Sequence, residues 1–238
     1  MASPGRWRAP AGGVIERLPP TRAPIHEVTL RIGYLSSKTA SLLGLLPLGV
    51  WTVNHLWNNL HALRGAEAWE GAVTHHRSPR VQLVTYAIVL LPLAIHALWG
   101  VVRVPGTRVQ AATSEFANVR HVLHRLAGLG ILAFLGAHLW LAFLRPRLFH
   151  GGPEPFDDLA REMRFHGPTL WVYLLGVLGT AYHLANGVQA VMVGWAPRPW
   201  GGTMNRLSLL AALVFLGTLA LGWGAIFALW RAGGMLTY

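Results

Sequence analysis

Four histidines lie deep inside apolar stretches, where an ionisable side chain is costly and usually has a function. They are His55, His96, His138 and His183. Neutral imidazole is a common ligand of iron and other transition metals, and two imidazoles can occupy both axial positions of a haem iron. A single such histidine could instead hydrogen-bond to a neighbouring helix or line a water-filled cavity. The positions of the four must therefore be compared with one another.

Five stretches contain no Asp, Glu, Lys or Arg, and the shortest has 19 residues: Thr39–Leu63, Val81–Val102, Leu126–Leu144, Phe165–Pro197 and Leu207–Trp230. About 20 helical residues cross the ~30 Å hydrocarbon core of a membrane. A large soluble all-α protein would need charged faces on its surface helices, which these stretches lack. The sequence predicts an all-α fold, an integral membrane bundle of five transmembrane helices at about 40–62, 81–103, 121–145, 167–196 and 205–231. We expect a basic N-terminal cytoplasmic arm over 1–38 and one transmembrane domain over 39–231.

Each of the first four expected helices carries one of the four histidines, late in its own apolar stretch. Neighbouring spans run in opposite directions. His55 and His138 therefore fall on one side of the membrane midplane (the outer pair), and His96 and His183 fall on the other (the inner pair). At 1.5 Å per residue, the two levels are roughly 10 Å apart along the membrane normal. Two histidines at each of two levels is the arrangement that two stacked bis-histidine haems require.

The basic residues give the expected orientation. With the N-terminus in the cytoplasm, the cytoplasmic segments hold 12 of the 20 Lys and Arg residues, as membrane proteins prefer. The C-terminus is then outside. The net charge of +11 comes from residues at span ends, which meet lipid headgroups or partner subunits, so it does not indicate nucleic-acid binding.

Other residues complete the expected site. The chain has no cysteine, which excludes Cys-ligated iron–sulfur clusters and covalently attached c-type haem. Arg125 and His124 at the inner end of the third span are candidate partners of a haem propionate, although an exposed anchoring role is open. Asn58, Asn59 and His61 at the outer end of the first span are candidate quinone contacts, although a capping role is open. Glycines flank the histidines, as haem approach or ordinary helix packing would require: Gly44, Gly49, Gly128, Gly130, Gly136, Gly176, Gly179 and Gly187.

Local strings around the histidines resemble one family. Ser41–Gly49 followed by Asn54-His55-Leu56, Leu91–Gly100 around His96, His124–Gly128 followed by His138, and Tyr182–Gly187 around His183 resemble the first four helices of the dihaem cytochrome b anchor subunits of succinate:quinone oxidoreductases. The string at Tyr182–Gly187 is the most specific. The resemblance covers nearly all of 36–231, and the fifth helix of that family carries no ligand, as here.

The resemblance implies the cofactors and partners. It implies two haem b groups, held by His55 with His138 (distal) and by His96 with His183 (proximal). It also implies a flavoprotein and an iron–sulfur subunit, which interconvert succinate and fumarate on the cytoplasmic side of the bacterial inner membrane, and a membrane quinone, often menaquinone. The dicarboxylate active site would belong to those partners, and the whole complex could form a higher oligomer. Some fumarate reductases of this type use an acidic residue two positions before the fourth ligand for proton transfer, where this chain has Ala181.

Two alternatives remain open. A dihaem anchor of another respiratory oxidoreductase, such as nitrate reductase, would use the same ligands with other partners. A haem-free transporter could use the histidines as a proton relay, and it would show internal repeats and broken helices. The sequence shows no convincing repeat.

Overall fold

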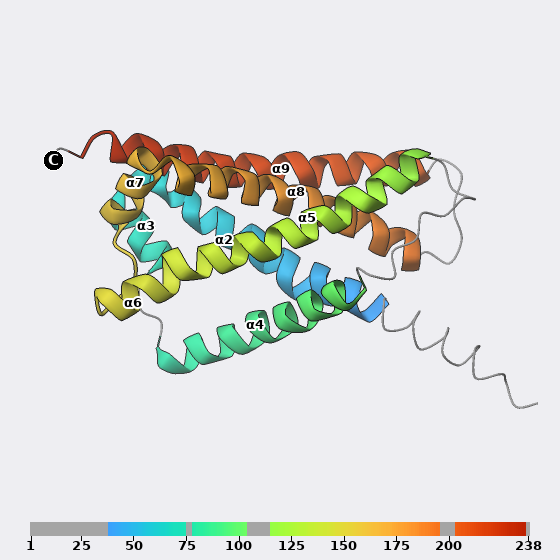
Figure 1. The fold of residues 1–238 in the computed structure, drawn as a ribbon, viewed down its shortest axis with the longest axis horizontal. Coiled ribbons are helices and arrows are strands. Elements are labelled where there is room, and N and C mark those ends of the chain that lie inside the picture. The colour runs from blue at the N-terminus through green and yellow to red at the C-terminus, as the bar shows by residue number, and fades with distance from the viewer. Residues whose placement is uncertain (1–37, 75–77, 104–114, 196–202, 237–238) are drawn as a thin grey trace, which may run out of the picture. The chain divides into compact units, whose positions relative to one another are not determined.

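The computed structural model describes residues 38–74, 78–103, 115–195 and 203–236, and every regular element in these ranges is helical. The predicted N-terminal arm, 1–38, lies outside the described residues except for its last residue. The four histidine-bearing segments and the C-terminal segment form long helices (Figure 1). The all-α prediction is confirmed for the described part of the chain.

The first long helix changes type along its length. It is α-helical over 38–43, π-helical in η1 (Gly44–Gly49), α-helical in α2 (Val50–Asn59) and 3₁₀-helical in η2 (Leu60–Arg64). The π-helical turn contains Pro47, whose ring excludes an ordinary i−4 hydrogen bond. Gly65 has φ of +98°, a conformation that favours glycine, and it turns the chain into α3 (Ala66–Val73).

Four more long helical segments follow. They are α4 (Pro79–Val102), α5 (Glu115–Leu139), α8 (Gly167–Trp195) and α9 (Thr203–Gly233). The helix of α5 continues through the π-helical turn η3 (Trp140–Leu144) into α6 (Arg145–Phe149), and a loop leads to α7 (Phe156–Phe165). Pro146 lacks an N–H group, so it cannot bond the carbonyl four residues earlier, within η3.

The helices pack unevenly. α8 packs mainly against α9 and α5, whereas α4 contacts mainly η1 and α5. Figure 1 shows α4 on one side of α2 and α5, with α8 and α9 on the other. Beyond its first turn, the side chains of α4 that face away from the bundle are mainly apolar, as in Leu83, Leu91 and Leu98. An apolar outward surface is the surface that lipid requires.

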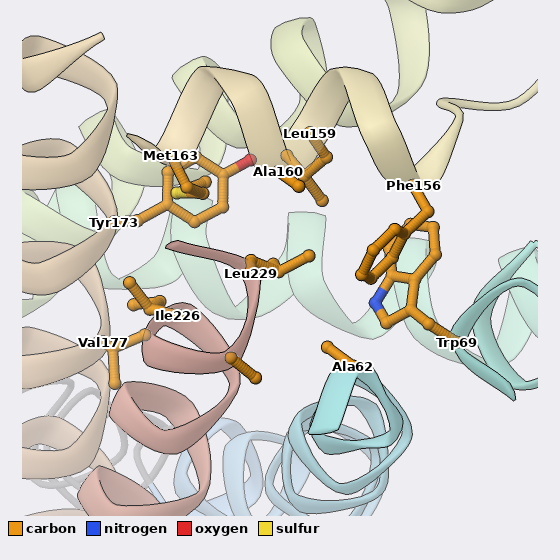
Figure 2. Close-up of a cluster of buried hydrophobic side chains, with 11 residues drawn as sticks. Ala62, Trp69, Phe156, Leu159, Ala160, Met163, Tyr173, Val177, Ile226 and Leu229 are labelled. Carbon is orange, nitrogen blue, oxygen red and sulfur yellow. The ribbon is translucent and has the colours of Figure 1, made fainter. Parts of the chain in front are cut away.

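A buried hydrophobic core lies at the end of the bundle that contains α3 and α7. Trp69 of α3, Phe156 and Met163 of α7, Tyr173 of α8 and Leu229 of α9 meet there, and Met163 is fully buried (Figure 2). The indole of Trp69 packs edge-on against Phe156, with ring centres 5.7 Å apart. Two short helices therefore close this end of the bundle.

Three described helical segments are long and apolar enough to cross a membrane: Leu83–Val102, Val119–Phe149 and Asn205–Gly233. The other two expected spans contain the polar residues Asn54, His55, Asn58, His183 and Asn186, which lower their mean hydropathy although they carry no charge. The chain is therefore an integral membrane protein of apolar helices, and the number of five spans stays a prediction.

Candidate functional site

The outer pair meets between α2 and α5. The imidazole rings of His55 and His138 have centres 5.8 Å apart and planes 76° apart. The inner pair meets between α4 and α8, where the ring centres of His96 and His183 are 6.0 Å apart and the planes 84° apart. The structure thus brings together four side chains from four helices as two separate pairs.

This spacing suits a metal ion between the two rings. Two imidazoles on opposite sides of one ion, with metal–nitrogen bonds of about 2 Å, have ring centres about 6 Å apart. Direct hydrogen bonds between the rings would bring nitrogen atoms to about 3 Å, but none joins the rings of either pair among the described residues. The geometry fits a bis-histidine metal site at both levels.

The other ring nitrogens of the inner pair are held by backbone carbonyls. His96 Nδ1 lies 3.0 Å from the carbonyl oxygen of Ala40, and His183 Nδ1 lies 3.2 Å from that of His124. A carbonyl oxygen can only accept a hydrogen bond, so each Nδ1 carries the proton and donates it. Each Nε2 then presents a lone pair, which is the tautomer that a metal-binding histidine needs.

The outer pair has different partners. His138 Nδ1 lies 3.2 Å from the hydroxyl of Tyr173. His55 stacks on Trp51, with ring centres 4.7 Å apart, and its Nε2 lies 3.4 Å from the side-chain nitrogen of Asn59. An amide nitrogen is a donor, so it faces the lone pair of Nε2, the same lone pair that would bind a metal.

Asn59 also joins the outer pair to the closed end of the bundle. Its side-chain nitrogen donates to the backbone carbonyl of His55 at 2.9 Å, and its oxygen accepts from Trp69 Nε1 at 3.2 Å. Asn59 therefore links the histidine of α2 to the core residue of α3.

Two of the eight flanking glycines touch the inner histidines. A Cβ at Gly44 would lie 2.6 Å from His96 Cε1, and one at Gly128 would lie 3.2 Å from His183 Cε1. A Cβ at Gly176 would instead overlap the ring of Phe134, which is close helix packing. Some of these glycines therefore make room for an imidazole and others allow close helix packing. Of the eight, only Gly44 and Gly128 directly make room for an imidazole.

One cavity of about 880 Å³ is lined by all four histidines. A volume of this size is within the range of ligand pockets, roughly 300–1,000 Å³. Arg125, Asn58 and Asn59 also line the cavity, whereas His61 does not. The guanidinium of Arg125 donates to the backbone carbonyl of Arg103 at 2.6 Å and to His121 at 3.2 Å, so it ties the end of α4 to α5.

His124 contacts a histidine of the inner pair directly, which its position in the sequence did not indicate. Its ring stacks on His183, with centres 4.1 Å apart and planes 6° apart, and its buried Nδ1 has no hydrogen-bond partner among the described residues. An unpaired buried nitrogen is costly, and such atoms often occur at functional sites. The helical spacing of His124 and Gly128, four residues apart on α5, could have indicated that both face His183.

Other contacts of the site were missed from the sequence. Trp51 lies four residues before His55 on the same face of α2, and Tyr173 lies about three turns before His183 on α8. Asn59 was a candidate quinone contact in the sequence, but its bonds to His55 and Trp69 were not foreseen. Helical spacing therefore carried a signal for each of them. Among the described residues, no group of three or more His, Asp or Glu side chains could hold a metal ion.

Comparison with known proteins finds a curated relative. The chain is 30% identical over 190 residues to the succinate dehydrogenase cytochrome b558 subunit of Bacillus subtilis, an alignment that covers 79% of this chain and 93% of the relative. No family model matches the chain, and no solved structure does. The extent of the match together with the apolar helices settles the family: this chain belongs to the succinate dehydrogenase cytochrome b558 subunits.

Proposed function

We propose that this chain carries electrons between the iron–sulfur subunit of a succinate:quinone oxidoreductase and membrane quinone, through two bis-histidine b haems. His55 and His138 would hold the outer haem, and His96 and His183 would hold the inner one. The observation that carries the proposal is the pair of ring separations, 5.8 and 6.0 Å, in one shared cavity. The cytochrome b name of the Bacillus subtilis relative supports haem b as the cofactor.

The residues around the histidines suit this task. A haem with two imidazole ligands supplies one-electron redox chemistry and leaves no open position for oxygen. The carbonyl oxygens of Ala40 and His124 hold the inner rings in the ligating tautomer, and Tyr173 holds His138 at the outer level. Such second contacts fix the orientation of a ligand and its basicity.

The polar lining gives candidate contacts for the rest of the cofactor and for the substrate. Arg125 and His124 at the inner end of the cavity are the proposed partners of a haem propionate, because guanidinium and imidazole donors match a carboxylate. Asn58 lines the cavity at its outer end and remains the proposed quinone contact there. His61 has weaker support, since it does not line the cavity.

The proposed setting is the bacterial inner membrane, with the N-terminus in the cytoplasm and the flavoprotein and iron–sulfur subunits bound on that side. The match to a succinate dehydrogenase subunit favours these partners over those of nitrate reductase. The ring separations favour metal ligation over a haem-free proton relay, which would be served better by directly bonded imidazoles.

Single substitutions of the four histidines test the proposal. In the complex purified with its partners, we expect His96→Ala and His183→Ala each to remove the inner haem, and His55→Ala and His138→Ala each to remove the outer one. A reduced-minus-oxidised spectrum with a haem count distinguishes the two losses. His166→Ala is the control, because His166 bonds Thr169 at 2.7 Å and does not line the cavity. Loss of the same haem from the His55 and His96 variants would contradict the pairing.

A further inference from the structure

A buried carboxyl group faces the outer end of the cavity. Glu154 lies in the loop between α6 and α7 and is only 5% exposed. It lines the same cavity as His138 and Tyr173. A carboxyl group is seldom buried without a task or a partner, so the surroundings of Glu154 decide what it can do.

Glu154 lines the cavity together with polar groups at the outer histidine pair. His138 Nδ1 bonds the Tyr173 hydroxyl at 3.2 Å, and both residues line the cavity together with Glu154. Figure 2 shows Tyr173 in one buried cluster with Met163 and Leu159 of α7, the helix that begins just after Glu154. The carboxyl group therefore borders the part of the cavity next to the proposed outer haem.

Arg145 contacts the carboxylates of Glu154 and Glu162, so the strengths of these two contacts can be compared. Its guanidinium lies 3.1 Å from Glu162 Oε1 and 3.5 Å from Glu154 Oε1. The shorter contact is to Glu162, which does not line the cavity. A purely structural clamp between α6 and α7 would depend mainly on Glu162. The longer contact leaves Glu154 less committed to its cation.

The charged groups around Glu154 come from several elements. Arg145 of α6, Asp158 of α7 and His150 of the loop act on it, and Glu162 and Tyr173 share its surroundings. Burial raises the pKa of Glu154 above its ordinary value, although Arg145 works against this rise. His150 and Asp158 are exposed at the surface. Glu154 thus stands between the cavity and water, and it can hold a proton closer to neutral pH than an ordinary carboxyl group.

We propose that Glu154 is a catalytic residue that transfers protons to quinone at the outer end of the cavity. This inference rests on the function proposed above, which supplies the electrons. Reduction of one quinone consumes two electrons and two protons and yields one quinol. For each proton, the carboxyl O–H bond of Glu154 breaks and an O–H bond forms on a quinone oxygen. Water at the exposed surface beside His150 and Asp158 then protonates the carboxylate again. In quinol oxidation the same steps run in reverse.

The test compares Glu154→Gln with Glu162→Gln in the assembled complex. Both variants remove a carboxylate that contacts Arg145, but only Glu154 lines the cavity. With succinate as donor and a short-chain quinone as acceptor, we expect kcat of the Glu154→Gln complex to fall about 100-fold, the usual scale of general acid catalysis. The KM for quinone should change little, and Glu162→Gln should leave both values near those of the unmodified complex.

The pH profile gives a second measurement. Quinone reduction needs protonated Glu154, so the rate should fall as pH rises through its raised pKa. Glu154→Gln should lose this decline, and Glu154→Asp should restore a large part of kcat with a displaced decline. If the Glu154→Gln complex fails to assemble, the Glu154→Asp complex still tests the proposal. A Glu154→Asp pH profile identical to that of the unmodified complex would overturn it.

Two further readouts separate this proposal from the function on which it rests. Succinate should still reduce the haem bands and a dye that accepts electrons at the flavoprotein in the Glu154→Gln complex. Equal kcat in Glu154→Gln and the unmodified complex, or equal losses in Glu154→Gln and Glu162→Gln, would overturn the role of Glu154 alone. An unmodified complex without haem would instead overturn the proposed function.

Discussion

At the scale of residues, the position of an inner histidine ring depends on a neighbouring glycine that has no side chain. The ring of His96 is held by the carbonyl of Ala40 and lies against Gly44, four residues further along the same helical segment. Because the bond to Ala40 fixes the ring from one side, the ring cannot move freely away from a new side chain at Gly44. Gly44 and Ala40 together determine where Nε2 of His96 points.

We therefore expect Gly44→Ala to deplete the inner haem selectively. The new methyl group would lie 2.6 Å from His96 Cε1, and such overpacking costs about 1–3 kcal/mol. A haem count with a reduced-minus-oxidised spectrum checks this. Gly130→Ala is the control, because no neighbouring atom lies within 4 Å of its Cβ position. Gly128→Ala, at 3.2 Å from His183, should give a smaller loss. Equal haem content in Gly44→Ala and Gly130→Ala would show that the close approach has no effect on binding.

At the scale of elements, the long helices were easier to predict than the short ones. Stretches without charge marked the long helices, because lipid as solvent forbids exposed charge. The same criterion did not detect α7, because its exposed face carries Asp157, Asp158 and Arg161. Its apolar residues Phe156, Leu159, Ala160 and Met163 follow the helical spacing i, i+3, i+4, i+7, so a search for that spacing would have found it.

The beginning of α7 depends on a residue far away in the sequence. Pro155 precedes the helix and provides no side-chain cap, and the backbone N–H of Phe156 donates to Glu70 Oε1 of α3 at 3.1 Å. A carboxylate at a helix N-terminus accepts an otherwise unpaired N–H and interacts favourably with the helix dipole. Glu70 therefore joins the two short helices that close the bundle.

Glu70→Ala should loosen the first turn of α7 by about 1 kcal/mol, the usual value of a lost N-cap. Faster amide hydrogen exchange over residues 157–160 would report this, with little change in α8. Glu67→Ala serves as the comparison, since Glu67 is exposed in the first turn of α3. The assignment fails if exchange in α7 is the same in both variants.

Part of the candidate site could also be predicted from the apolar stretches of the sequence. Comparison of histidine heights along apolar stretches needs only the helical rise, and it points to the two pairs that the structure brings together. The bonds from Nδ1 to Ala40 and His124 depend on how two helices rotate and cross, which one sequence does not specify. Glu154 was hidden for another reason: nothing local distinguishes it from Glu162, and only the fold buries one of them in the cavity wall.

At the scale of the whole molecule, the predicted orientation places the closed end of the bundle outside. Of the nine acidic residues, six lie in the segments predicted to be outside, including Glu154 and Glu70. The Lys and Arg residues favour the opposite side, as the positive-inside rule requires. Glu154 would then exchange protons with the external medium, whereas Arg125 and Arg103 would lie at the cytoplasmic end.

The chain contains no cysteine, so a single introduced cysteine is a unique label. Gly152→Cys lies in the loop before Glu154, and no neighbouring atom lies within 4 Å of its Cβ position. In intact cells, we expect a membrane-impermeant maleimide to label Gly152→Cys. Thr107→Cys, in the segment predicted to be cytoplasmic, should react only after the cells are opened. The reverse pattern would invert the orientation and place Glu154 in the cytoplasm.

Two b haems in each copy of this chain are the central expectation from four histidines in two pairs. The most direct measurement is the ratio of haem b to this chain in the complex purified with its partners, by pyridine haemochrome against quantitative amino-acid analysis. We predict a ratio of about two, with both haems reducible by succinate, because each pair has the ring spacing of a bis-histidine site. A ratio of one, or a colourless complex that still oxidises succinate, would contradict it.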